Sequence, residues 1–153
     1  MTKKEKSEKK KQKDMEGGVK ERLVEAVMAR ATGGTFSDTD MAALAQLFPP
    51  AVLSIALEAA LSRGVVRVVA APSGRTGYEF CFGGTRHFLL LCPEMLFCPC
   101  DAVAGEIEAG GEPLICKHLL AAKIAVATKS LVEETVSDAE FAERCLQSAK
   151  FLT

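Results

Sequence analysis

The sequence predicts an α+β fold with short N-terminal helices, a small antiparallel three-stranded sheet, a metal-binding finger and C-terminal helices. Three observations predict it. Apolar residues recur at helical spacing through the first third of the chain. β-branched and aromatic residues are then frequent from residue 65 to residue 92, and a run rich in Leu and Ala without helix breakers follows residue 117.

The composition is that of one globular domain. The chain has 153 residues, of which 48% are hydrophobic and only 6% aromatic. A chain of this length can bury a core without disulfides, and this core must be built mainly from Leu, Val, Ala and Ile. No 18 consecutive apolar residues occur, so we expect no membrane span. The start of the chain lacks the apolar stretch of a secretory signal, so we expect a reducing compartment in which the six cysteines are thiols or metal ligands.

The N-terminus is basic and the rest of the chain is acidic. Residues 1–14, MTKKEKSEKKKQKD, contain seven Lys against three acidic residues, which leaves residues 15–153 with a net charge of −5. No apolar residue lies between Met1 and Met15, so we expect residues 1–17 to form a disordered basic tail. Such a tail could be a nuclear localisation signal or a weak nucleic-acid contact, and a solubilising tail is the simpler alternative.

Residues 18–64 are predicted to be helical. The segment 19–31 carries its apolar residues on one stripe. The next apolar-periodic run begins after Ser37 or Asp38, either of which is a good N-cap. The pair Pro49-Pro50 ends that helix, and the second proline suits the first turn of the helix that follows.

The residue composition changes from helix-forming to strand-forming types after Gly64. This glycine is predicted to be the C-cap of the helix that follows the two prolines. The run VVRVVAAPSGRTGYEFCFGGTRHFLLLC is interrupted by a Pro-Ser-Gly and a Gly-Gly turn signal. It therefore predicts antiparallel strands at 65–71, 77–82 and 86–91. We assign residues 65–130 to a β-meander followed by the metal-binding finger.

The C-terminal quarter of the chain is predicted to be helical. HLLAAKIAVATKSLVEE has no helix breaker, so residues 118–134 are predicted to form one helix. A second helix follows, capped by Ser137 or Asp138. We assign residues 131–153 to a C-terminal helix.

Four potential metal ligands lie in two closely spaced pairs. Cys98 and Cys100 are two residues apart, Cys116 and His118 are two residues apart, and fifteen residues separate the pairs. In an extended segment residues i and i+2 project to the same side, so the first pair can hold one ion. In a helix interior such residues diverge, so Cys116 must approach a helix whose first turn contains His118. Three thiolates and one imidazole are typical ligands of structural zinc.

Other interpretations fit this pattern less well. A disulfide is disfavoured in a reducing compartment, and the redox motif has two intervening residues rather than one. A Cys–His nucleophilic dyad would need an orienting group and an oxyanion hole, for which the sequence shows no signature. Cys92 could replace Cys98 if that side chain pointed away from the ion, whereas Cys81 and Cys145 lie in apolar patterns typical of a core.

Cys98-Pro-Cys100, the spacer, and Cys116-Lys-His118-Leu-Leu-Ala121 resemble a SWIM zinc finger. Ala121 matches the alanine that follows the histidine in that pattern, and its small side chain would let the helix pack close to the metal loop. Lys117 lies between two ligands, where it can offset the formal −1 charge of a zinc ion held by three Cys and one His. The flanking segments AAPSGRTGYEF and LICKHLLAAKIA further resemble the small SWIM-domain subunit of the Shu complex.

This resemblance implies a non-catalytic adaptor in homologous recombination. Shu-type SWIM subunits pair with a recombinase paralogue that has a RecA fold, so the resemblance implies such a partner, recombinase filament assembly on single-stranded DNA, and a nuclear location. The sequence contains no phosphate-binding loop with a lysine, so we expect no ATP hydrolysis by the chain itself. The predicted helix after His118 is apolar over more than half its circumference, so Leu119, Leu120 and Ile124 are candidate partner-binding residues.

Two other functions remain open on the sequence. A direct nucleic-acid-binding zinc module would bind DNA in a salt-sensitive way as a single chain. The acidic body disfavours it, although Arg63, Arg67, Arg75 and Arg86 are scattered around the predicted strands. A metal-dependent or thiol enzyme would require an exchangeable water on the metal or a thiolate of depressed pKa.

Overall fold

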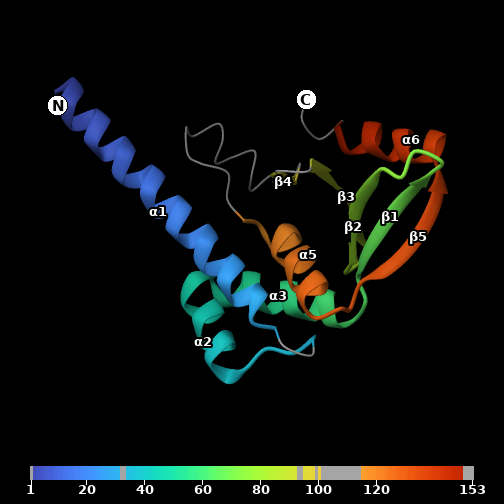
Figure 1. Ribbon diagram of the computed structural model, residues 1–153, viewed down its shortest axis with the longest axis horizontal. Helices are drawn as coiled ribbons and strands as arrows, with labels where there is room; N and C mark the ends of the chain where they lie inside the picture. Colours follow the sequence, from blue (N-terminus) through green and yellow to red (C-terminus); the bar gives the residue numbers. More distant parts are fainter. Residues whose placement is uncertain (1, 32–33, 93–94, 99, 101–114, 150–153) are drawn as a thin grey trace.

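The computed structural model describes residues 2–31, 34–92, 95–98, 100 and 115–149, with only the backbone path described for 10–18, 85–92, 95–97 and 149. The α+β fold is confirmed (Figure 1). Among the described residues, no helix is long and apolar enough to cross a membrane. The elements are α1 (Lys3–Ala29), α2 (Asp38–Leu47), α3 (Pro50–Leu61), β1 (Val65–Ala71), β2 (Thr76–Phe82), β3 (Thr85–Cys92), β4 (Met95–Phe97), α5 (Lys117–Ala127), β5 (Val132–Ser137) and α6 (Asp138–Ala149).

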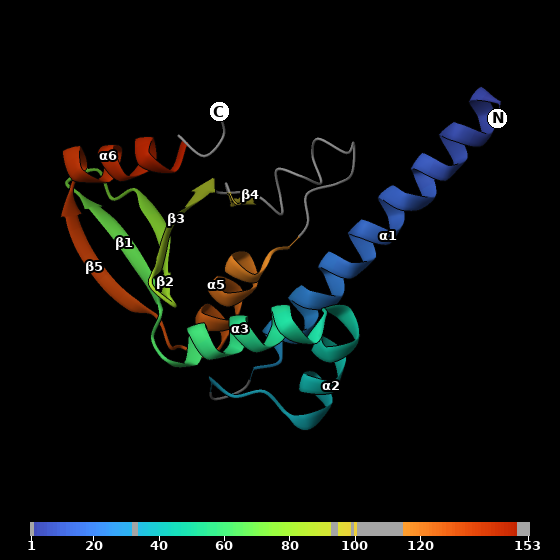
Figure 2. The ribbon, with the colours of Figure 1, turned by 180° about the vertical axis from the view of Figure 1, so that it is seen from behind.

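Helix α1 contradicts the predicted disorder of residues 1–17, because it begins at Lys3 and continues to Ala29. Thr2 caps it by accepting a hydrogen bond from the Glu5 N–H, and the Glu5 carboxylate accepts one from the Thr2 N–H in return. Lys, Glu and Gln are strong helix formers, and a helix needs no buried face in order to be hydrogen-bonded within itself. The first turns of α1 extend away from the body of the molecule (Figures 1 and 2).

The helix caps predicted for α2 and α3 agree with the structure, except for the C-cap of α3. Ser37 is the N-cap of α2 and forms a capping box with Asp40, and Pro50 opens α3. Gly64 is not the C-cap of α3, because Ser62 holds that position and Arg63 adopts the positive φ of 62°. Gly64 is needed for a different reason. A Cβ there would lie 2.8 Å from the carbonyl oxygen of Cys81, in the neighbouring strand.

The sheet contains the three predicted strands and two more, in the order β4-β3-β2-β1-β5. Strands β1 to β4 pair antiparallel, whereas β5 pairs parallel to β1. The helix predicted at 118–134 is therefore too long: α5 ends at Ala127, Lys129 takes a positive φ of 56°, and a strand starts at Val132. For the same reason the assignment of 131–153 to a helix is wrong in its first part.

The sheet has a helix-covered core on each face. Val65 and Phe80 face the larger core, which α3, α5 and the C-terminal part of α1 complete. Val66 and Val68 lie on the other side, where the smaller core also contains residues of β5 and α6. This alternation follows from the period of two along a strand. Helix α5 is thus held between the sheet and the N-terminal helices, as Figure 2 shows from behind.

The smaller core is bordered by an ion-pair network. Arg144 of α6 reaches Glu79 of β2 at 3.0 Å, Glu134 of β5 at 3.2 Å and Glu140 of its own helix at 2.7 Å. The Glu79 side chain is only 4% exposed, so its charge needs a partner. The neighbouring Glu134 carboxylate and the other acids raise the pKa of the Arg144 guanidinium, which keeps it charged at every ordinary pH.

Candidate metal centre

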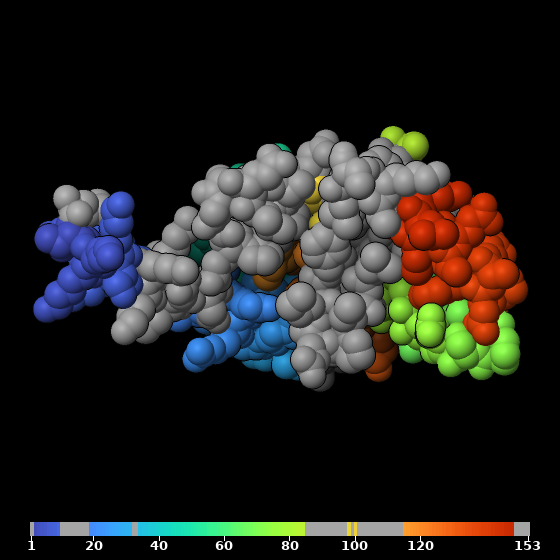
Figure 3. Space-filling view, turned by 90° about the horizontal axis from the view of Figure 1, so that it is seen from above, coloured from blue at the N-terminus to red at the C-terminus, as the bar shows by residue number. Residues whose placement is uncertain are grey.

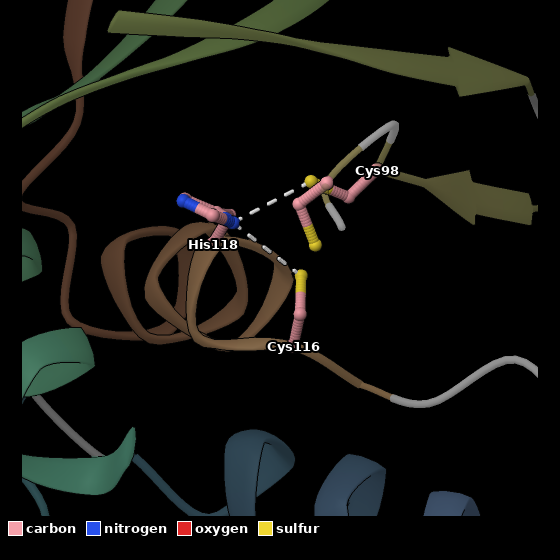
Figure 4. A group of neighbouring side chains, drawn as sticks. Cys98, Cys116 and His118 are labelled. Atoms are coloured by element: carbon pink, nitrogen blue, oxygen red, sulfur yellow. Dashed lines mark hydrogen bonds between the residues drawn. The ribbon is translucent and has the colours of Figure 1, made fainter. Parts of the chain in front are cut away.

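The structure brings the four predicted ligands together. Cys98 and Cys100 follow β4, Cys116 is the N-cap of α5, and His118 lies in the first turn of that helix. One ligand atom from each residue lies within 4.8 Å of all the others. Figure 4 shows His118 projecting from α5 toward the sulfurs of Cys98 and Cys116. The segment 101–114 between the two pairs lies outside the described residues.

The ligand separations suit a tetrahedral ion. The Nδ1 atom of His118 lies 3.6 Å from Cys98 Sγ and 3.7 Å from Cys116 Sγ. Four ligands placed tetrahedrally at zinc–sulfur and zinc–nitrogen bond lengths of about 2.3 and 2.0 Å would be about 3.5–3.8 Å apart. These two separations therefore fit a shared zinc ion, with Nδ1 as the imidazole ligand atom.

The start of α5 explains how ligands two residues apart can converge. Cys116 is extended, with φ −77° and ψ 172°, and the helix begins at the next residue. The Leu119 N–H donates a hydrogen bond to Cys116 Sγ at 3.4 Å. Such N–H groups have no partner within the helix and lie at the positive end of its dipole, so they stabilise a thiolate. The predicted placement of Cys116 before the helix and His118 within its first turn is confirmed.

The site is buried, and its thiols oppose one another's ionisation. The four ligand residues are between 0% and 8% exposed. Hydrogen bonds with Cys100 and Cys116, followed by burial, raise the pKa of Cys98 far above its ordinary value. A hydrogen bond with Cys100 and burial outweigh the contacts that stabilise the Cys116 thiolate, and raise its pKa to about 11. Three thiolates can therefore share this space only if a cation neutralises them.

The residues next to the ligands differ in their surroundings. Phe80 of β2 meets the imidazole of His118 edge to face, with ring centroids 4.7 Å apart. Ala121 is completely buried, as its predicted close packing requires, whereas Lys117 is exposed to solvent. Phe80 was not predicted as a site residue. The alternation of side chains along β2 assigns Phe80 to the core side of the strand, but only the three-dimensional packing shows that His118 lies on that side.

The predicted partner-binding residues are wrong. Leu119, Leu120 and Ile124 are at most 4% exposed and belong to the larger core. A helix that is apolar around most of its circumference is typically a buried helix, and α5 is enclosed by the sheet and α3. Among the described residues, the exposed large apolar side chains lie elsewhere, at Val19, Leu23, Leu61, Val126 and Leu146.

The remaining cysteines do not join the cluster in the part of the chain that the structure describes. Cys81 is half-buried and its thiol donates a hydrogen bond to the Glu79 carboxylate at 3.4 Å. Cys145 is half-buried against the smaller core, and burial raises the pKa of its thiol. The side chain of Cys92 lies outside the described residues, but Cys98 points into the cluster, so no substitute ligand is required.

Comparison with known proteins gives two partial matches, and no family model matches the chain. A segment of 73 residues, 48% of the chain, is 34% identical to zinc finger SWIM domain-containing protein 7 of Danio rerio and covers 51% of it. A segment of 90 residues, 59% of the chain, is 25% identical to the Homo sapiens protein of the same name and covers 64% of it. The chain thus matches about half to two thirds of these relatives. Their names and the Cys/His cluster confirm the predicted resemblance to SWIM-type zinc finger proteins.

Proposed function

We propose that the chain is a non-catalytic, zinc-stabilised adaptor that binds a RecA-fold recombinase paralogue in the nucleus. The assembled pair would promote recombinase filament formation on single-stranded DNA during homologous recombination. The observation that carries this proposal is the buried set of three thiols and one imidazole that joins the end of β4 to the start of α5. The similarity to the two SWIM domain-containing proteins supports it.

The ligand set favours a structural role for the metal. Catalytic zinc sites typically keep one position open for water or substrate, whereas structural sites are closed by four protein ligands. Here Cys98, Cys100, Cys116 and His118 supply four ligand atoms and are nearly inaccessible to solvent. Zinc at this site would fix how α5 packs against the sheet, and would thereby shape the surface that a partner meets.

The partner would supply any nucleotide chemistry. The sequence has no phosphate-binding loop with its lysine. The proposed adaptor would therefore act by binding its partner, and the partner would hydrolyse any nucleotide. The net charge of −5 on residues 15–153 also disfavours DNA binding by the zinc module itself, because phosphate neutralisation provides most non-specific affinity. A protein partner therefore suits the body of the molecule better than nucleic acid does.

The best candidate surface for this partner lies on α1. Val19 and Leu23 are 52% and 47% exposed and lie one turn apart on the helix, where they form an apolar stripe. One turn further along, Val27 continues the same line but is buried in the larger core. The apolar stripe is thus a continuation of the core onto an exposed helix, the geometry by which helices dock in apolar grooves of partners.

Charge substitution on the apolar stripe tests this assignment. We expect Val19→Asp with Leu23→Asp to reduce co-purification of a co-expressed RecA-fold paralogue by at least about tenfold, because a buried unpaired charge is costly at an interface. Leu146→Asp is the control, since this residue of α6 is 67% exposed and lies on the other side of the sheet. Zinc content should be unchanged in both variants. Full partner binding by the stripe variant would refute the assigned surface, and absence of a paralogue from the wild-type complex would refute the adaptor function.

A further inference from the structure

The first turns of α1 carry lysines over more than half of the helix circumference. Lys3, Lys4, Lys6 and Lys9 are all exposed. Successive residues of a helix are about 100° apart, so these four lysines fall within an arc of about 220°. We call this arc the basic face. Glu5 and Glu8 fall within the remaining arc, so the acidic side chains of these turns do not interrupt the basic face.

The basic face is separated from the rest of the molecule. The start of α1 lies at one end of the molecule and α6 at the other (Figure 3). A rise of about 1.5 Å per residue places Lys9 about 15 Å and Lys3 about 24 Å along the helix from Val19. The same helical spacing places Val19 and Leu23 in the arc opposite the lysines. A partner docked on the apolar stripe would therefore leave the basic face exposed.

We infer that the basic face binds the phosphate backbone of single-stranded nucleic acid. A flexible polyanion can follow lysines that are spread along and partly around a helix, and each lysine that meets a phosphate releases a bound counterion. The acidic body repels the same ligand, so contact is favoured where α1 extends away from it. This inference rests on the proposed function only for the choice of single-stranded DNA as the probe.

An anionic membrane fits the basic face less well. Helices that lie on membranes bury an apolar face between the lipid headgroups. No apolar residue lies between Met1 and Met15, so this part of α1 has none to insert. Attraction to lipid would therefore rest on charge alone, without the apolar contribution that membrane-binding helices use.

Removal of three charges from the basic face tests the inference. The full zinc-loaded chain is titrated with fluorescent oligothymidylate over a range of salt concentrations, by anisotropy. Lys4→Gln, Lys6→Gln and Lys9→Gln together should weaken binding at least about tenfold at low salt and reduce the slope of log affinity against log salt by about 2, or about 0.7 for each lost phosphate contact. The control replaces Arg63, Arg75 and Lys129 with Gln, which removes the same charge from exposed positions outside α1 and should change affinity less than about threefold.

The possible outcomes separate this site from the adaptor function. Equal losses in the two variants would overturn the inference, because net charge alone would then explain binding. Absence of DNA binding by the wild-type chain at low salt would overturn it too, as would lysine-dependent binding to vesicles of anionic lipid without binding to DNA. Co-purification of the paralogue should be unchanged in the lysine variant. Loss of that co-purification would instead place the partner on the basic face.

Discussion

The two faces of the sheet are stabilised by different chemistry. On one face, α5 packs in a large apolar core that also contains the buried Cys/His cluster. On the other face, α6 covers a small apolar core and is tied to the sheet by the ion pairs of Arg144. On the first face, the end of β4 and the start of α5 meet at thiol groups, whose ionised forms need a cation to neutralise them. The second face needs only charges that the chain itself provides, so the two faces should respond differently to metal, acid and mutation.

Loss of a metal ligand should have the largest effect. We expect Cys116→Ser to abolish stoichiometric zinc binding and to destabilise the α5 face, because structural zinc contributes about 10–16 kcal/mol in finger peptides, comparable with the whole stability of a domain of about 5–15 kcal/mol. Zinc analysis of the purified chain and amide hydrogen exchange would measure it. Amides of α5 should lose protection more than those of β1 paired with β5.

Cys145→Ser is the matched control for that variant. It makes the same chemical change at a half-buried cysteine on the opposite face of the sheet. Zinc content should stay near one ion per chain, and stability should fall by no more than about 1–2 kcal/mol. If the two serine variants retained equal amounts of zinc, the distinction between the faces would be lost.

Acid should act selectively on the face that contains the Cys/His cluster. Without metal, the Cys98 and Cys116 thiols have raised pKa values, about 11 for Cys116, and so hold their protons at neutral pH. Zinc binds thiolates and must displace those protons, so its affinity rises with pH and falls as pH is lowered. Up to three protons released would change affinity by up to about a thousandfold per pH unit. Competition with a chelator between about pH 6 and about pH 8 would measure the slope, and a zinc affinity independent of pH would exclude thiolate ligands.

Arg144→Ala should weaken the other face by a smaller amount. It removes the guanidinium that reaches the nearly buried Glu79 and two further carboxylates, at a cost of about 3 kcal/mol. Urea denaturation would measure the loss, and the zinc content should be unchanged. Arg144→Lys keeps the charge and should recover part of the stability. A loss of zinc in the alanine variant would show that the two faces are not independent.

The Cys/His cluster could be predicted from sequence because its chemistry is local. Cys98 with Cys100, and Cys116 with His118, each combine a two-residue spacing with a ligand type that suits zinc. The caps at Ser37 and the helix start at Pro50 were predictable for the same reason, since the signal lies within a few residues. The α+β class followed from hydrophobic periodicity, which reflects burial on one side of each element.

The errors arose where non-local packing or helix propensity decides the structure. Residues 132–137 were predicted as helix, whereas they form strand β5. The local sequence does not show this, because the strand β1 that pairs with β5 lies more than sixty residues away in the chain. The basic N-terminus was predicted to be disordered because it lacks apolar residues, although its helix-forming residues and the Thr2 to Glu5 capping box favour a helix. Leu120 and Ile124 were predicted as partner contacts because sequence shows how apolar a helix is, but not how many elements enclose it.

The most direct test of the account is the coordination of zinc in the folded chain. Zinc X-ray absorption on the purified protein should show one ion per chain with three sulfur ligands at about 2.3 Å and one nitrogen ligand at about 2.0 Å, and no bound water. His118→Ala should abolish the zinc signal, as Cys116→Ser should, whereas Cys145→Ser should leave the spectrum unchanged. A folded chain that contains no zinc, or zinc bound by fewer than four protein ligands, would contradict the account.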